Sequence, residues 1–129
     1  MMTERLKAIC ISPDTAIRGA MDVIGQAVLA GAPTGIALVV APDESLLGIL
    51  TDGDIRRGLL RGASLDDPVE RIMVRDPVTL PSSLSPTELL AQVRDEARKR
   101  TRLREQKVDK LILVDDAGRV ADIVSFYDL

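Results

Sequence analysis

The sequence predicts an α/β (α+β) protein made of two βαββα repeats that pack against each other. The first observation is an internal match: residues 38–55, LVVAPDESLLGILTDGDI, align without a gap with residues 112–129, ILVDDAGRVADIVSFYDL. The second is that strand and helix signals follow the same order in both halves. The third is the composition: 129 residues, 46% hydrophobic but only 2% aromatic, fit one domain-sized unit with an aliphatic core. We assign residues 1–64 to the first repeat and 65–129 to the second, whose last helix is truncated where the sequence ends.

Each repeat is expected to run strand, helix, strand, strand, helix. Short apolar runs bounded by turn residues predict the strands, and apolar residues at helical spacing predict the helices. In the first repeat these criteria place strands at residues 7–11, 36–40 and 46–50 and helices at 15–29 and 54–61. In the second they place strands at residues 78–80, 111–114 and 120–124 and a helix at 86–102. Residues 62–77, with glycine, proline and acidic residues, form the linker.

Both long helices carry start signals. SPDT at residues 12–15 and SPTE at residues 85–88 each offer a hydroxyl N-cap and a proline near the first turn. In the second, Ser85 and Glu88 have capping-box spacing. The apolar stripe expected on the first helix consists of Ile17, Met21, Ile24 and Val28. One half is too small for a solid core, so the two repeats should share one.

The composition excludes several functional classes. Without histidine, the chain has no histidine-based acid–base catalysis, Ser-His-Asp triad or histidine-ligated zinc. The single cysteine, Cys10, is expected to be a small core residue in a reducing compartment. The net charge of −3 disfavours a nucleic-acid partner, so the basic segment 98–107 is expected to be a solvated helix end or counter-charge for a phosphate. No secretory signal and no apolar stretch of membrane-spanning length are present, so we expect a cytoplasmic protein without a membrane partner.

The stretch TDGD, residues 51–54, poses the functional question, because two carboxylates, a hydroxyl and a glycine stand where a strand meets a helix. Asp52 and Asp54 can be interpreted as Mg²⁺ ligands or as an acid–base pair. Thr51 or Asp52 can instead cap the helix. In a further interpretation the hydroxyl and a carboxylate hold a ribose while Arg56 and Arg57 reach a phosphate. The plain alternative for these arginines is exposure, with local pairing to acidic residues.

The hydroxyl and one carboxylate recur in the second half. Ser125 and Asp128 align with the threonine and the second aspartate of TDGD, whereas Phe126 takes the place of the first aspartate. A metal site based on the first aspartate is therefore not repeated. A helix cap does not require an acid three residues after the hydroxyl in both halves, which favours a ligand clamp.

LLGILTDGDI and VADIVSFYDL resemble the Gly-x-x-Thr/Ser-x-x-Asp signature of cystathionine-beta-synthase (CBS) domains, which usually occur in tandem as a Bateman module. The resemblance covers roughly residues 7–129. TDGDIRRGLL is also similar to CBS pairs fused to sugar-phosphate isomerases and sugar nucleotidyltransferases. The resemblance implies two CBS repeats packed with pseudo-two-fold symmetry, two clefts between them, and pairing of modules into a homodimer.

The resemblance also implies a ligand and its contacts. Many CBS pairs bind an adenosine ligand: AMP, ADP, ATP or S-adenosylmethionine. In the first cleft Asp54 would contact the ribose hydroxyls and Thr51 the ribose or phosphate, and Asp128 and Ser125 would do the same in the second. The adenine would lie against the backbone near Ile11–Ser12 and Ile36–Ala37, or near Leu80–Pro81 and Lys110–Leu111.

The second repeat departs from the signature at two points. Asp122 stands where the first repeat has Gly48, and its side chain is expected to crowd the backbone or to add a charge near a phosphate. Phe126 and Tyr127 replace the Asp-Gly pair and can stack on a base or belong to a core or dimer interface. The first cleft is therefore favoured.

Taken together, the sequence predicts a regulatory CBS pair with no catalysis of its own. It would bind an adenine nucleotide between its repeats and control a partner enzyme or a catalytic domain covalently attached in the full-length protein. The alternatives are a structural dimerisation module with empty clefts and a fragment of a sugar-phosphate-metabolising enzyme. No catalytic residue, metal ligand or required cofactor is assigned.

Overall fold

The computed structural model describes residues 2–98 and 110–125. Its elements, in chain order, are α1 (Glu4–Lys7), β1 (Cys10–Ile11), α2 (Ile17–Gln26), β2 (Ile36–Val40), β3 (Leu46–Thr51), α3 (Asp52–Leu60), the 3₁₀ turn η1 (Val69–Arg71), β4 (Thr79–Pro81), α4 (Pro86–Arg98), β5 (Lys110–Val114) and β6 (Val120–Ser125). The predicted helix end at residue 102, most of the basic segment and residues 126–129 lie outside the described residues. No helix in the described part of the chain is long and apolar enough to cross a membrane.

Within the described residues, the strands form two three-stranded sheets, in the orders β1-β2-β3 and β4-β5-β6. In each sheet the first strand pairs with the second in parallel, and the second with the third in antiparallel fashion. The two antiparallel ladders share one register, since Ile36 lies opposite Thr51, and Lys110, 74 positions later, lies opposite Ser125. Each ladder is also irregular at the matching place, just after Val39 and just after Leu113. The predicted duplication is therefore confirmed down to its hydrogen-bond register.

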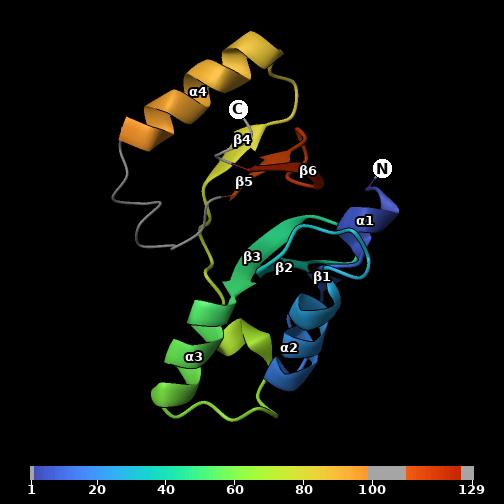
Figure 1. The fold of residues 1–129 in the computed structure, drawn as a ribbon, viewed down its shortest axis with the longest axis vertical. Coiled ribbons are helices and arrows are strands. Elements are labelled where there is room, and N and C mark those ends of the chain that lie inside the picture. The colour runs from blue at the N-terminus through green and yellow to red at the C-terminus, as the bar shows by residue number, and fades with distance from the viewer. Residues whose placement is uncertain (1, 99–109, 126–129) are drawn as a thin grey trace.

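The molecule is layered, with the two sheets facing each other, α2, α3 and α4 on the outside and α1 beside the sheets (Figure 1). Helices α2 and α3 lie on the outer side of the first sheet, and α4 lies on the outer side of the second. Because successive strand residues point to opposite faces, Ile36 and Leu38 enter the core between the sheets. Ala37 and Val39, in turn, pack beneath α2 and α3.

Both repeats contribute to the core between the sheets. Its buried members are Met2, Leu6, Ile9, Ala27, Ala32, Ile36, Leu38, Ile49, Ile112, Val120 and Ile123. A separate, smaller core beneath α4 consists of Val78, Leu80, Val93, Leu111 and Leu113. The expected shared core is therefore present.

The turns of the two hairpins are hydrogen-bonded to each other. The Leu46 N–H donates to the Gly118 carbonyl (3.0 Å), and the Val120 N–H donates to the Glu44 carbonyl (3.1 Å). Leu46 and Val120 are equivalent in the internal alignment, as are Glu44 and Gly118. The two bonds are thus related by the pseudo-two-fold symmetry of the repeats.

The predicted strand over residues 7–11 was wrong in its first half. Lys7 belongs to α1, and β1 comprises only Cys10 and Ile11. Thr3 starts this extra helix, because its side chain accepts a hydrogen bond from the Leu6 N–H at 3.3 Å. Leu6 is buried in the shared core, so the turn is held in place by packing as well as by its cap.

The helix starts were predicted with mixed success. α2 begins after Ala16, which makes no side-chain cap, so Ser12 does not cap this helix. The capping box of α4 is confirmed: the Ser85 N–H donates to Glu88 Oε1 (3.1 Å) and the Glu88 N–H donates to Ser85 Oγ (3.2 Å). α3 starts at Asp52, two residues earlier than predicted.

The buried face of α2 also differs from the predicted stripe. Ile17 and Ile24 are buried as expected, but Met21 is 45% exposed and Val28 is 68% exposed. Ala20 is buried in their place. The alanine side chain is small, so the helix can approach the sheet closely. The predicted stripe consisted of the larger apolar residues and therefore missed it.

Candidate ligand-binding site

Thr51 and Asp54 form a buried capping box where β3 meets α3. Thr51 Oγ1 accepts the Asp54 N–H at 3.2 Å. Asp54 Oδ2 accepts both the Thr51 N–H and the Thr51 hydroxyl, each at 2.9 Å. The two residues are only 6% and 7% exposed. The helix-cap interpretation of the TDGD stretch is therefore confirmed, and a carboxylate at this position is also favoured by the helix dipole.

Arg57 completes this cluster from the next turn of α3. Its Nη2 donates to Asp54 Oδ1 at 2.7 Å, so both oxygens of the buried carboxylate have partners. Its Nη1 is buried and has no hydrogen-bond partner among the described residues. The plain alternative for this arginine is thus confirmed in its local pairing with an acidic residue, but not in its exposure, because the side chain is only 26% exposed. Arg56 and Asp52 are exposed and do not join the cluster.

A cleft of about 380 Å³ lies between the repeats. The first repeat supplies a cation and a hydroxyl, and the second supplies another cation. The lining residues are Arg5, Gly31, Ala32, Pro33, Thr34, Lys110 and Ile123. The volume is within the range of small-molecule sites, and two cations beside a hydroxyl suit an anionic group such as a phosphate. We call these residues the inter-repeat cleft.

The sheet register relates the inter-repeat cleft to the repeated hydroxyls. Lys110, a predicted site residue, lines the cleft and lies opposite Ser125 across the β5–β6 ladder. Thr34 precedes Ile36 by two residues, and Ile36 lies opposite Thr51 across the β2–β3 ladder. The side chains of Ile36 and Ala37 are buried in the cores, so only their backbone can meet a ligand. Asp128 lies outside the described residues.

The structure does not bring Ile11 and Ser12 to this place. Ile11 pairs with Val39, three residues along β2 from Ile36, which is about 10 Å at the rise of a strand. Both residues instead line a groove of about 760 Å³ at the other end of the parallel strands, together with residues 40–42. The sequence reasoning also missed Arg5 and the loop 31–34, although the Gly-Ala-Pro-Thr-Gly composition of residues 31–35 marked a turn.

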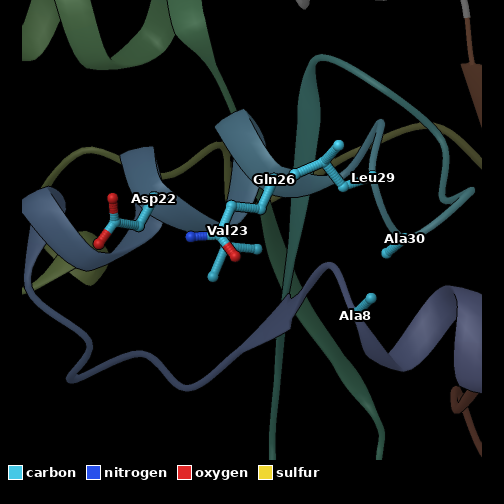
Figure 2. Close-up of a pocket in the computed structure, with 6 residues that line it drawn as sticks. All are labelled: Ala8, Asp22, Val23, Gln26, Leu29 and Ala30. Atoms are coloured by element: carbon cyan, nitrogen blue, oxygen red, sulfur yellow. The ribbon is translucent and has the colours of Figure 1, made fainter.

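A further pocket of about 380 Å³ lies beside α2. Figure 2 shows Val23 and Gln26 on the helix and Ala8 on the segment before β1, with Leu29 and Ala30 beyond the helix end. One carboxylate, Asp22, and one amide are its only polar side chains. Without a cation, this pocket suits a phosphate less well than the inter-repeat cleft does.

Other chemistry gains no support from the described residues. Within them, no group of three His, Cys, Asp or Glu side chains is arranged to hold a metal ion. Asp52, one of the two proposed Mg²⁺ ligands, is exposed, and both oxygens of the other, Asp54, are hydrogen-bonded within the cluster.

Comparison with known proteins identifies the repeat unit. The family model of the CBS domain matches the chain twice, over residues 1–61 and 69–129. The chain belongs to the CBS-domain family. Both matches fall on the two halves that share strand order and register, so the CBS pair and the structural duplication coincide.

Among curated relatives, the CBS pair is 26% identical over 125 residues to inosine-5'-monophosphate dehydrogenase of Aquifex aeolicus. The matched region covers 96% of this chain and 22% of the enzyme. The CBS pair is 32% identical over 100 residues to arabinose 5-phosphate isomerase GutQ of Salmonella typhi, covering 74% of this chain and 27% of the isomerase. The chain thus spans less than a third of either enzyme. The predicted similarity to CBS pairs of sugar-phosphate isomerases is confirmed.

Solved structures show the same fold. A CBS domain protein from Pyrobaculum aerophilum, solved in complex with AMP, superimposes with a TM-score of 0.68 over 98% of this chain and 90% of that protein. The sequence identity is 17%, so the likeness establishes the arrangement of the two CBS repeats.

The two CBS repeats differ at the glycine of their signature for a structural reason. At Gly48 an added Cβ would lie 2.7 Å from the Val74 carbonyl oxygen, because the linker pairs with Ile49 at the edge of β3. At the equivalent Asp122 the side chain is exposed, and its Oδ1 accepts the N–H of Ile123 at 2.8 Å. The carboxylate thus bonds the edge N–H that the linker carbonyl bonds in the first repeat. The expected crowding at Asp122 does not occur.

Proposed function

We propose that this CBS pair is a cytoplasmic regulatory module that binds an adenine nucleotide in the inter-repeat cleft and controls an enzyme to which it is attached or which it partners. The observation that carries the proposal is the composition of the cleft, since Arg5 comes from the first repeat and Lys110 from the second. An anion held by both cations contacts both repeats. Its binding free energy then depends on how the repeats are arranged, which is what control of a second site requires.

The comparisons support the two parts of this proposal separately. The relatives named above are enzymes much longer than the matched region, which supports an attached catalytic domain. The similar CBS pair solved with AMP supports an adenosine ligand, namely AMP, ADP, ATP or S-adenosylmethionine.

Within this proposal, each residue has a defined part. Asp54 and Thr51 do not line the inter-repeat cleft but stand at the end of β3, where Thr51 lies opposite Ile36. In this proposal they hold the ribose of one nucleotide, and Arg56 and Arg57 approach its phosphate. Ser125 and Asp128 hold the ribose of a second nucleotide beside Lys110. The adenine lies against the backbone at Ile36–Ala37 or Lys110–Leu111. Ile11 and Ser12 have no part in this arrangement, because they lie at the opposite end of the parallel strands β1 and β2.

Isothermal titration calorimetry with AMP, ADP, ATP and S-adenosylmethionine tests the proposal. At least one ligand should bind, and Lys110→Met should weaken a phosphorylated ligand by about tenfold, the loss of one charge-assisted contact. Lys7→Met is the matched control, because Lys7 is a cation on the same helix as Arg5 but does not line the cleft. No binding of any ligand at millimolar concentration would refute a nucleotide sensor.

The main alternative is a structural dimerisation module, and one observation favours it. Apolar side chains are exposed around α2 and α3: Met21 is 45% exposed, Val28 68%, Leu29 87% and Leu60 80%. Covering such residues with a second CBS pair would remove apolar surface from water. Sedimentation equilibrium of the wild type and of Leu60→Glu tests this alternative, because an interface across these helices should dissociate when a charge enters it.

A further inference from the structure

The guanidinium of Arg57 is bonded to Asp54, the carboxylate that holds the ribose in the proposed site. Its Nη2 lies 2.7 Å from Asp54 Oδ1, in a pair whose side chains are 26% and 7% exposed. The other carboxylate oxygen already accepts two hydrogen bonds from Thr51. While Arg57 remains in this position, three hydrogen bonds already reach the Asp54 carboxylate, so it cannot accept both hydroxyls of a ribose diol.

The same guanidinium has an unsatisfied donor. Nη1 is buried and has no hydrogen-bond partner among the residues that the structure describes. A buried donor without an acceptor is unfavourable, and an oxygen that reached it would relieve that cost. Gly53 leaves the space in which the guanidinium lies, since a Cβ at this position would stand 3.0 Å from Nη1.

From these contacts, and resting on the proposed function, we propose that Arg57 is a specificity-determining latch on Asp54, which makes the site prefer phosphorylated over unphosphorylated nucleosides. A nucleoside such as adenosine must break the Asp54–Arg57 bond to bind Asp54 through both ribose hydroxyls, and it offers the guanidinium no anionic acceptor in return. A nucleotide breaks the same bond, but its phosphate accepts hydrogen bonds from the released guanidinium, including the donor that has no partner.

The test compares the affinities for AMP and for adenosine in the wild type, Arg57→Met and Gly53→Ala. The wild type should bind AMP at least about tenfold more tightly than adenosine. In Arg57→Met adenosine should gain affinity and AMP should lose it, which brings the ratio close to one. In Gly53→Ala the added Cβ, 3.0 Å from Nη1 and 3.4 Å from Nη2, presses on the guanidinium and weakens its bond to Asp54 without removing its charge, so adenosine should gain affinity while AMP binding is retained.

The controls separate a lost latch from a lost fold or a general loss of charge. Arg61→Met removes an exposed cation from the end of α3 and should leave the ratio unchanged. Gly53→Ala keeps both Asp54 and Arg57, so it tests the latch even if Arg57→Met weakens the helix cap. An unchanged ratio in both Arg57→Met and Gly53→Ala overturns the latch and leaves nucleotide binding in place. Absence of AMP and adenosine binding in every protein overturns the latch, and the proposed function is overturned with it only if ADP, ATP and S-adenosylmethionine also fail to bind.

Discussion

Glu44 and Gly118 occupy equivalent positions in the two hairpin turns, and both have a left-handed backbone, with φ values of 72° and 78°. Their carbonyl oxygens accept the two hydrogen bonds that join the hairpins. Glycine adopts this conformation freely, whereas a residue with a Cβ is strained by about 1–2 kcal/mol. Glu44 is the only residue other than glycine with positive φ in the described part of the chain. The first hairpin therefore contains a strain that the second avoids.

Replacing Glu44 with glycine should stabilise the protein. We expect Glu44→Gly to raise the free energy of unfolding by about 0.5–1 kcal/mol, because relief of the strain exceeds the added entropy of the unfolded chain. Urea unfolding followed by circular dichroism measures the change. Glu44→Ala keeps the Cβ and should bring no gain. Equal gains for the glycine and alanine variants would assign the effect to the side-chain charge instead of the backbone.

Gly48→Ala should destabilise the CBS pair by roughly 1–3 kcal/mol. The added Cβ would meet the Val74 carbonyl oxygen at 2.7 Å and Met73 Sδ at 2.9 Å, and a backbone oxygen cannot rotate away. The comparison is Asp122→Ala in the other repeat, where only the acceptor for the Ile123 N–H is lost, at a cost of about 1 kcal/mol. An unchanged urea midpoint for Gly48→Ala would show that the linker is not held against β3 in solution.

The sequence revealed those parts of the fold that depend on local patterns. The β2–β3 and β5–β6 hairpins were predictable because apolar strands flank turn-forming residues at a constant offset of 74 positions, which also relates Ile36 to Lys110 and Thr51 to Ser125. α1 was missed because it is a single turn with one apolar residue, Leu6, and no glycine or proline separates it from β1. Its only start signal was Thr3, an N-cap residue followed by a single helical turn.

The candidate site was only partly predictable, because tertiary packing creates it. The capping box of Thr51 and Asp54 is local in sequence and could be anticipated. The presence of Arg5 and Lys110 in one cleft could not, since the two residues are far apart in the chain and line the same cleft only when the repeats share a core. The structure places Ile11 opposite Val39 and away from the inter-repeat cleft, a position that the motif alone does not give, so its part in ligand binding stays a prediction.

Ile112→Ala tests whether the two repeats fold as one unit. Ile112 belongs to the second repeat but is buried in the core that contains Leu38 and Ile49 of the first. The cavity should lower the free energy of unfolding by about 2–5 kcal/mol. It should also weaken amide hydrogen-exchange protection in β2 and β3, since both repeats lose the same core.

The matched control is the adjacent residue on the opposite face of β5. Leu111 is fully buried, but it packs in the separate core beneath α4. Leu111→Ala should therefore destabilise the second repeat more than β2 and β3. If Ile112→Ala and Leu111→Ala reduced hydrogen-exchange protection in β2 equally, damage to either core would destabilise both repeats, and the distinction between the two cores would be contradicted.

Cys10 should be unreactive in the folded protein. Its thiol lies 3.2 Å from Met2 Sδ and 3.3 Å from the Leu6 carbonyl oxygen. Burial, with a smaller contribution from the charge of Glu44, raises the pKa of the thiol from 9.0 to about 11. Because the thiolate is the nucleophile, alkylation by iodoacetamide at pH 8 should be slow in buffer and fast in urea. Equal rates under the two conditions would contradict the burial of the thiol.

The same shift predicts how stability depends on alkaline pH. Between the unfolded pKa near 9.0 and the folded pKa of about 11, the unfolded chain loses the thiol proton while the folded chain keeps it. The folded state then binds more protons, so the free energy of unfolding should fall as pH rises through this interval. Lysines titrate in the same range, so the thiol contribution is the difference between the wild type and Cys10→Ala. The wild type should lose more stability than Cys10→Ala between pH 9 and 11, and parallel pH profiles would show that the thiol is not responsible.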